Sequence, residues 1–375
     1  MARASGRKVE TGFRLSRCSV NSVDRPSRVR MDARRSSEAP PFWWEPADWR
    51  AWSLAPFSAL YGLVAGYRMA SAKRAKVDVP VLCVGNFTVG GEGKTPVSIA
   101  LAKQARKLGR KPGFLSRGHG GSMTTAHLVD AEKDLSRHVG DEPLLLARHA
   151  PTMVAPDRLT GARELVGIGC DFIIMDDGFQ SARIHMDYAV MVVDARRGLG
   201  NGHVIPGGPL RARLIDQLRF ADAVLTMGDG TAADHVVRQT SRAGRPVFQA
   251  RLKPRGMRAI KGGRFLAFAG IGNPKKFFDS VAEAGGAVVE GKSFPDHHPY
   301  DDDDARDLIA AAGRDGLQLI TTEKDLVRLR GGSGALGELA EASRVLQVEA
   351  VFEAADMPVT IIENTIENWR ERSLK

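Results

Sequence analysis

Short apolar runs alternate with amphipathic stretches along most of the chain after Val79. The run PVLCVG at 80–85 is apolar throughout, as is typical of a strand buried on both faces, and the stretch at 96–109 has the periodicity of an amphipathic helix. Further runs of strand length follow at 112–118, 172–177, 189–195 and 223–228. Strands separated by helices predict parallel βαβ units, and therefore an α/β fold in which helices flank a parallel sheet.

A second, smaller α/β pattern begins after about residue 250. Apolar runs joined to helical stretches recur at 265–286 and 317–325. We therefore expect two α/β domains, a main one at 78–250 and a smaller C-terminal one at 251–375. Residues 1–40 and 41–77 belong to neither pattern.

The segment 41–77 is rich in aromatic residues. Four of the five tryptophans lie in it, and the 17 residues from Ala51 to Tyr67 carry no charge. This run is shorter than the roughly 20 residues that span a bilayer. Tryptophan and tyrosine favour the lipid headgroup region, so we expect a helix that lies in the membrane interface. The alternative is a helix packed on the protein core.

The positive charge of the chain is concentrated in its first residues. The formal net charge is +10, and residues 1–35 contain ten Lys and Arg against three Asp and Glu. The remainder is only slightly basic and has no basic–aromatic module, so we expect no nucleic-acid partner. The tail at 1–40 lacks the apolar run of a secretory signal. It is expected to be a disordered arm or a gene start extended beyond Met31, with a transit peptide or a tether to anionic lipid as the alternative.

Cysteine usage indicates a reducing compartment. Cys18, Cys83 and Cys170 are far apart and do not have the spacing of metal ligands. We expect ordinary reduced thiols, as in a cytosolic protein.

A phosphate-binding loop lies between the first predicted strand and the first predicted helix. The segment TVGGEGKT has the glycines, lysine and threonine of a Walker A motif, although Thr88 stands where the strict pattern has its first glycine. Lys94 is expected to reach the β- and γ-phosphates of ATP, and the Thr95 hydroxyl to hold Mg²⁺. The predicted nucleotide-binding residues are Thr88, Val89, Gly90, Gly91, Glu92, Gly93, Lys94 and Thr95. The main domain is therefore predicted to have a P-loop NTPase-type fold.

Two adjacent carboxylates end a later apolar strand. Asp176 and Asp177 follow FIIM, where a Walker B aspartate would hold Mg²⁺ directly or through water. The alternative is a turn that caps the strand. With a phosphate-binding loop upstream, we predict a metal site made by Thr95, Asp176 and Asp177.

Arginines are concentrated in two glycine-rich loops. Arg117 lies in SRGHGG, just after a predicted strand, and Arg196, Arg197 and Arg211 lie in the long loop at 192–213. Guanidinium groups match the geometry of phosphate oxygens, so these four are predicted to bind an anionic substrate.

Two further motifs carry groups that can move a proton. VGDEP contains Asp141, whose alternative role is to cap a helix, and FPDHHPY contains His297 and His298 beside Asp296. A histidine that faces a phosphate site is a candidate for proton transfer.

Seven motifs in one order resemble a known family. VGNFTVGGEGKTP, SRGHGG, VGDEP, DDGFQ, DARRGLGNGHVIPGGPLR, FPDHHPY and TTEKD are similar to the motifs of tetraacyldisaccharide 4′-kinases, the lipid A 4′-kinases of Gram-negative bacteria. The resemblance runs from about Trp43 to 321–325. The family also has a residue other than glycine at the position of Thr88. It usually has SRGYGG, where this chain has His119.

The resemblance implies transfer of the ATP γ-phosphate to the 4′-hydroxyl of a tetraacyldisaccharide 1-phosphate at the cytoplasmic face of the inner membrane. It implies Asp141 as the general base and His297 as its partner, with His298 as the weaker choice. Lys94 is predicted to be the third catalytic residue. The lipid substrate is held in the bilayer by its acyl chains, so peripheral or monotopic membrane contact is expected. No obligate protein partner is expected.

Two other functions fit parts of the sequence. A P-loop GTPase switch acting on a protein partner at the membrane needs an element that recognises guanine, and TTEKD at 321–325 has its lysine one position too late. A non-catalytic module that binds nucleotide and membrane predicts that Asp141→Ala leaves function intact.

Overall fold

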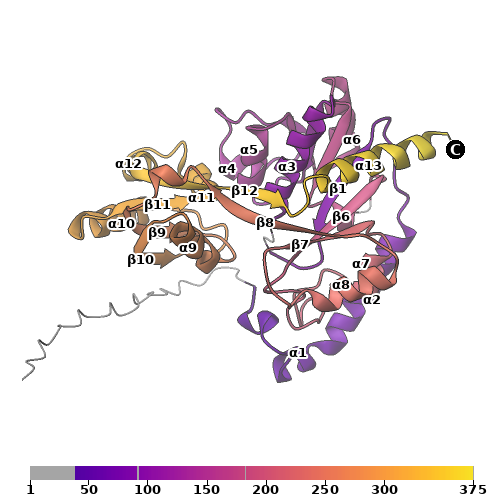
Figure 1. Cartoon of the computed structure of the whole chain (residues 1–375), viewed down its shortest axis with the longest axis horizontal. Helices are drawn as coiled ribbons and strands as arrows, with labels where there is room; N and C mark the ends of the chain where they lie inside the picture. Colours follow the sequence, from indigo (N-terminus) through magenta and orange to yellow (C-terminus); the bar gives the residue numbers. More distant parts are fainter. Residues whose placement is uncertain (1–38, 91–92, 182, 375) are drawn as a thin grey trace, which may run out of the picture.

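The computed structural model describes residues 39–90, 93–181 and 183–374, which form two lobes joined through one continuous sheet (Figure 1). The predicted tail up to residue 38, with Met31, lies outside the described residues. The strand order is β10-β9-β11-β12-β8-β7-β6-β1-β5-β2-β4-β3. The predicted α/β fold with a mostly parallel sheet flanked by helices is confirmed.

The main lobe is built on eight strands. Neighbouring strands of this lobe are parallel from β8 to β4, and the short edge strand β3 is antiparallel to β4. The strands are β1 (Val81–Asn86), β2 (Pro112–Ser116), β3 (His127–Leu128), β4 (Thr152–Val154), β5 (Phe172–Asp176), β6 (Tyr188–Asp194), β7 (Ala223–Met227) and β8 (Val247–Arg255). All six residues of β1 are buried, as expected of a strand covered on both faces.

Helices cover both faces of the main sheet. Alternate residues of β1 enter different cores: Leu82 packs with α3 and α13, whereas Val81 packs with α6, α7 and α8. The helices of this lobe are α3 (Lys94–Lys107), α4 (Ser136–Val139), α5 (Asp141–Ala147), α6 (Arg158–Gly167), α7 (Leu214–Leu218), α8 (Asp234–Arg242) and the last helix, α13 (Met357–Ser373). Short 3-10 turns, η1 (Pro41–Trp44), η2 (Phe179–Ser181) and η3 (Met257–Ala259), complete the connections.

The second lobe is a smaller α/β unit. Parallel strands β9 (Arg264–Ala269), β10 (Ala287–Ser293), β11 (Gln318–Thr322) and β12 (Ser343–Phe352) form its sheet. One face is covered by α9 (Pro274–Glu283), and the other by α10 (Asp302–Arg314) and α12 (Ala335–Ala342). Helix α11 (Glu323–Leu329) follows β11 and faces α5 of the main lobe.

Strands β8 and β12 carry the chain between the lobes. They pair antiparallel over six positions, from Ala250 with Phe352 to Arg255 with Gln347. The long strands form a two-stranded bridge between the lobes (Figure 1). After β12 the chain returns, and α13 packs on α3, β1 and β6. Residues 251–375, expected as one domain, are therefore divided, because their last helix lies on the main lobe.

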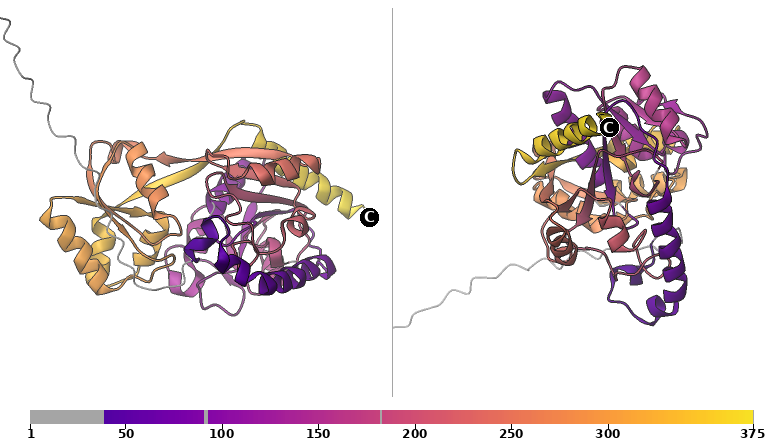
Figure 2. Two further views of the ribbon diagram at one scale, coloured as in Figure 1. Left: turned by 90° about the horizontal axis from the view of Figure 1, so that it is seen from below. Right: turned by 90° about the vertical axis from the view of Figure 1, so that its right-hand side faces the viewer.

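The aromatic segment forms two helices on the outside of the main lobe, α1 (Trp49–Ser53) and α2 (Ala55–Ser71) (Figure 2, dark violet). One stripe of α2, made of Ser58, Gly62, Gly66 and Met69, is buried. A Cβ on Gly66 would lie 2.5 Å from the carboxylate of Asp216, so glycine permits this close approach.

The other side of α1 and α2 exposes large apolar side chains. Trp49 and Tyr67 are 76% and 72% exposed, and Phe57 and Leu60 are each 64% exposed. One face of the segment is therefore packed on the protein, and the other face is uncovered. Within the described residues, no helix is both long and apolar enough to cross a membrane.

Candidate active site

The phosphate-binding loop connects β1 to the first turn of α3. Gly90 and Gly93 have φ values of 123° and 90°, which glycine adopts far more readily than residues with a side chain. Lys94 begins α3, is 5% exposed, and places Nζ 3.3 Å from the carbonyl oxygen of Gly90 and 3.9 Å from Asp177. Thr88 and Val89 precede the turn, whereas Gly91 and Glu92 lie outside the described residues. The ammonium group thus lies against the loop backbone at Gly90.

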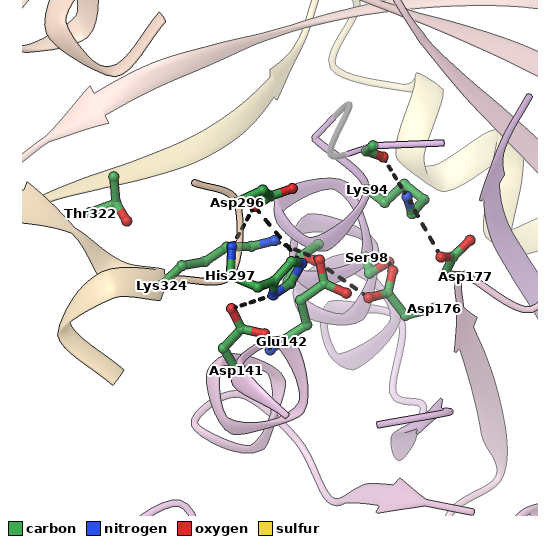
Figure 3. A network of polar contacts seen from close by, with 12 residues as sticks. Lys94, Ser98, Asp141, Glu142, Asp176, Asp177, Asp296, His297, Thr322 and Lys324 are labelled. Atoms are coloured by element: carbon green, nitrogen blue, oxygen red, sulfur yellow. Dashed lines mark hydrogen bonds and ion pairs between the residues drawn. The ribbon is translucent and has the colours of Figure 1, made fainter. Parts of the chain in front are cut away.

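Asp176 lies at the carboxyl end of β5 behind the loop. Its carboxylate accepts a hydrogen bond from Ser98 Oγ at 2.9 Å (Figure 3). It also accepts one from Thr95 Oγ1 at 3.4 Å. Burial, and then the charge of Glu142, raise the pKa of Asp176 to about 7. A cation bound at this carboxylate would favour its ionised form.

Asp177 is held differently from its neighbour. Arg211 donates two hydrogen bonds to it, at 2.8 and 3.0 Å. Although burial opposes ionisation, Lys94 and Arg211 hold the pKa of Asp177 well below its usual range. Asp177 therefore remains ionised.

The donor set fits Mg²⁺. Carboxylate and hydroxyl oxygens suit this ion, which completes its coordination with water and substrate phosphates. Accordingly, no group of three or more His, Cys, Asp or Glu in the described part of the chain is arranged to hold a metal by itself. Thr95 contacts Asp176 beside the loop, and the adjacent Asp177 pairs with Arg211 and Lys94; their role as metal ligands stays a prediction.

One large cavity, of about 1040 Å³, joins these groups. It runs from Tyr61 and Arg68 of α2, past the phosphate-binding loop, to His297 and Lys324 of the second lobe. Residues from both lobes and from the aromatic segment therefore line a single space.

The four predicted substrate arginines separate into two pairs. Arg117 and Arg211 line the cavity, although Arg211 also donates from Nε to the carbonyl oxygen of Thr88 at 2.9 Å. Arg196 and Arg197 do not line it. Arg196 Nη1 lies 3.8 Å from Asp279 of α9, and Arg197 donates to the carbonyl oxygen of Gly272 at 3.1 Å. The structure thus gives the second pair partners in the second lobe.

Arg158 is a cavity residue that the sequence did not single out. It begins α6, is 2% exposed, and donates from Nη1 to the carbonyl oxygen of Ala155. Its Nε is buried with no hydrogen-bond partner among the described residues. Burial and the neighbouring Arg117 lower the pKa of Arg158 to about 10. The feature that could have indicated Arg158 as a site residue is its position just after β4, at the carboxyl edge of a parallel sheet.

Asp141 and His297 meet across the lobes. Asp141 begins α5, and its Oδ2 lies 3.2 Å from His297 Nδ1 (Figure 3). His298 instead lies 2.7 Å from Asp304 in its own lobe and stacks on Phe294. Of the two histidines that the motif offers, only His297 therefore contacts Asp141.

Two cations of α11 reach the acidic start of α5, and neither was predicted as a site residue. Lys324 Nζ donates to Glu142 at 2.5 Å, and Arg328 donates to Asp141 from Nε at 2.9 Å and also from Nη2. Burial opposes ionisation of Asp141, but His297, Lys324 and Arg328 hold its pKa well below its usual range. These contacts join residues more than 180 positions apart in the sequence.

Comparison with known proteins gives one family. A family model described as tetraacyldisaccharide-1-P 4′-kinase matches residues 50–367. Tetraacyldisaccharide 4′-kinases of Mesorhizobium japonicum and Brucella anthropi are 60% and 56% identical, covering 91% and 90% of this chain and 99% and 98% of theirs. LpxK of Aquifex aeolicus, solved in complex with ATP, matches with a TM-score of 0.66 and 25% identity, over 84% of this chain and 99% of that chain. These matches confirm the resemblance seen in the motifs: the chain belongs to the tetraacyldisaccharide-1-P 4′-kinase family.

Proposed function

We propose that this chain transfers the γ-phosphoryl group of ATP, with Mg²⁺, to the 4′-hydroxyl of a tetraacyldisaccharide 1-phosphate at the cytoplasmic surface of the inner membrane. The observation that carries the proposal is one cavity that contains Lys94 of the phosphate loop, His297 of the Asp141–His297 pair and part of the aromatic helix α2. The alternative of a GTPase switch is not favoured by the family to which the chain belongs.

The nucleotide phosphates fit the loop at 88–95. Lys94 supplies a positive charge inside the loop, and the N-terminus of α3 points its free N–H groups at the same place. Positioning and charge stabilisation supply most of the rate enhancement in phosphoryl transfer. Mg²⁺, held by Thr95, Asp176 and Asp177, would neutralise charge that develops on the phosphate oxygens.

The acceptor sugar is assigned to the part of the cavity lined by Arg117 and Arg158. These two guanidinium groups repel one another, as the lowered pKa of Arg158 indicates, so a phosphate between them removes that repulsion. His297 of the Asp141–His297 pair lines the same cavity, and its ring contacts that of His119, two residues after Arg117, so the pair can take the proton of the acceptor hydroxyl.

The exposed side of α1 and α2 provides the membrane contact. Its apolar side chains are uncovered, whereas Tyr61 and Arg68 of α2 also line the cavity. A lipid whose acyl chains stay in the bilayer can therefore present its sugar to the cavity beside α2. Burying one exposed side chain of this size stabilises binding by about 1.5–3 kcal/mol.

The proposal is tested by incubating the full chain with γ-labelled ATP, Mg²⁺ and detergent-dispersed tetraacyldisaccharide 1-phosphate. We expect a labelled bisphosphate lipid, with the label at the 4′ position. The matched control is Lys94→Ala, which removes the charge from the loop while leaving the rest of the cavity intact. Unlabelled lipid from folded, ATP-binding protein would contradict the proposal.

A further inference from the structure

Lys324 is a partly buried cation that the second lobe places in the cavity. It lies in the first turn of α11, directly after β11, and lines the cavity together with Lys94 of the main lobe. The backbone around it is fixed, because the Thr322 side chain accepts from the N–H of Asp325 at 3.1 Å and Asp325 is fully buried. Lys324 is therefore a charged side chain that a fixed backbone presents to a ligand-sized space.

The ammonium group of Lys324 has donors to spare. It donates to Glu142 at 2.5 Å (Figure 3), and this is its one hydrogen bond within the described part of the chain. An ammonium group carries three N–H donors, so two of them remain for a ligand. Although burial lowers the pKa of Lys324, the charges of Glu142 and Asp141 raise it above its usual value, so the group keeps its proton at neutral pH.

Joining the lobes is not a sufficient role for this lysine. Helix α11 already contacts α5 through Arg328, which donates to Asp141 from two nitrogens. Burying two charges costs free energy that their attraction does not always return, so a second ion pair at the same contact is weak evidence for a stabilising role. The free donors of Lys324 are better explained by a ligand that it contacts.

Glu142 connects Lys324 to the phosphate-binding loop. The charge of Lys324, and then that of Lys94, hold the pKa of Glu142 below its usual value against the effect of burial. After burial, the charge of Glu142 is in turn the largest cause of the raised pKa of Asp176, which lies beside the loop. Two ammonium groups, one from each lobe, therefore act on the same carboxylate.

The γ-phosphoryl group has to lie in this part of the cavity during transfer. The attacking and leaving oxygens lie roughly in line on opposite sides of the γ-phosphorus. The leaving oxygen belongs to the phosphates expected at Lys94, and the acceptor hydroxyl is expected near His297, which lines the cavity from the second lobe. The γ-phosphorus is then between Lys94 and His297. Glu142 holds the ammonium group of Lys324 within range of the charge of Lys94.

We infer that Lys324 Nζ donates a hydrogen bond to an oxygen of the γ-phosphoryl group of ATP, and that Glu142 positions the ammonium group for this contact. The inference rests on the proposed function and adds a cation of the second lobe to it. No bond to Lys324 forms or breaks. The bond from the γ-phosphorus to the β,γ-bridging oxygen breaks with its electron pair leaving on ADP, the acceptor oxygen bonds to the γ-phosphorus, and the acceptor proton leaves to the Asp141–His297 pair. The charge of Lys324 stabilises the negative charge on the γ-phosphoryl oxygens.

The first test compares two nucleotides in the absence of lipid. Calorimetry gives the affinities of the full chain for AMP-PNP, an ATP analogue that is not hydrolysed, and for ADP, which has no γ-phosphate, each with Mg²⁺. We expect Lys324→Met to bind AMP-PNP at least about tenfold more weakly, the size of one hydrogen bond to a charged group, and to keep its affinity for ADP. Lys324→Arg keeps a positive charge and should recover part of the loss.

The matched control is Lys276→Met. Lys276 also comes from the second lobe and lines the cavity, but it pairs with Asp194 at 3.0 Å. Its replacement should leave the ratio of the two affinities unchanged. If Lys324→Met does not fold, Lys324→Gln, which can still donate to Glu142, provides the same comparison. A variant of Lys324 that changes both affinities alike or neither, or a loss in Lys276→Met confined to AMP-PNP, would overturn the inference.

The second test measures turnover. Lys324→Met should lower kcat in the lipid kinase assay by about 10²–10³-fold, as expected for one lost charge-stabilising donor, with a smaller change in the KM for lipid. A kcat within about twofold of the wild type would contradict the inference. Absence of lipid phosphorylation by the wild type would instead overturn the proposed function, and the nucleotide comparison, which contains no lipid, would still decide whether Lys324 contacts the γ-phosphate.

Discussion

Replacing Arg328 measures how much its ion pairs between the lobes contribute to the free energy of unfolding. Its guanidinium group bridges Asp141 of α5 and Asp325 of its own helix, and donates to the carbonyl oxygen of Gly270. The side chains of Arg328, Asp141 and Asp325 are only 6%, 4% and 0% exposed. Replacement by methionine keeps most of the volume and removes the charge, so two buried carboxylates lose their strongest donor.

Removing one partner of a buried ion pair costs about 3–5 kcal/mol, because the other charge is left uncompensated. We expect Arg328→Met to lower the free energy of unfolding by this amount at neutral pH. The measurement is urea denaturation followed by tryptophan fluorescence. The matched control is Arg330→Met, an exposed arginine two residues further on, which should change the free energy by less than about 0.5 kcal/mol.

The pH dependence of this loss has a definite sign. The folded-state pKa of Asp141 lies below its usual value, so its contribution to stability is present above the unfolded pKa of about 3.9 and is lost as pH falls. The difference in the free energy of unfolding between Arg328→Met and the wild type should therefore become smaller below about pH 4. A difference under about 1 kcal/mol at neutral pH, or one that does not change with pH, would refute the view that Arg328 compensates a buried ionised Asp141.

Three further predictions concern the nucleotide, the metal and the membrane. Lys94→Ala should lower kcat/KM by about 10²–10³-fold in the lipid kinase assay, as expected when a charge-stabilising donor is lost. A smaller effect would show that Lys94 does not contact the phosphates. Asp176→Asn should raise the Mg²⁺ concentration for half-maximal activity by at least about tenfold, measured by metal titration; an unchanged requirement would place the ion elsewhere. The double variant Phe57→Ser/Leu63→Ser should bind phosphatidylglycerol vesicles about 10²-fold more weakly in a sedimentation assay, because each lost side chain contributes about 1.5 kcal/mol of binding free energy. Unchanged binding would show that α2 does not contact the membrane.

The local parts of the site could be predicted from the sequence. The loop at 88–95 and Asp176 each follow a buried strand, and carboxyl ends of parallel strands meet at one edge of the sheet. The strand and helix boundaries of β1 and α3 agree with the expected ones to within two residues. The apolar periodicity was sufficient here, because each motif and the strand that places it are adjacent in the chain.

The contacts between the lobes could not be predicted in this way. Arg196 and Arg197 lie in an arginine-rich loop, which indicated anion binding, yet their partners are Asp279 and Gly272 on the other lobe. Arg328 has no local pattern that points to Asp141, since the two lie on different lobes and meet where α11 packs against α5. Charged residues whose partners are distant in the sequence produce no periodic pattern from which those partners could be predicted.

The aromatic segment shows a third situation. Its composition suggested an interfacial helix or a core helix; α2 packs one face on the protein and leaves the other uncovered, and its position in a membrane interface stays a prediction. Gly62 and Gly66 allow close packing on one side, whereas Phe57 and Leu60 remain exposed on the other. Hydrophobicity alone does not separate these faces, because the packed stripe depends on small residues spaced four apart.

The most direct test of the central claim is the position of the label after reaction of the full chain with γ-labelled ATP, Mg²⁺ and tetraacyldisaccharide 1-phosphate. The lipid product should be resolved by mass spectrometry and by selective removal of the 1-phosphate. We predict one added phosphoryl group at the 4′-oxygen, which stays labelled after the 1-phosphate is removed, and about 10²–10³-fold slower formation of this product by Lys94→Ala. Absence of a phosphorylated lipid, or label lost with the 1-phosphate, would contradict the account.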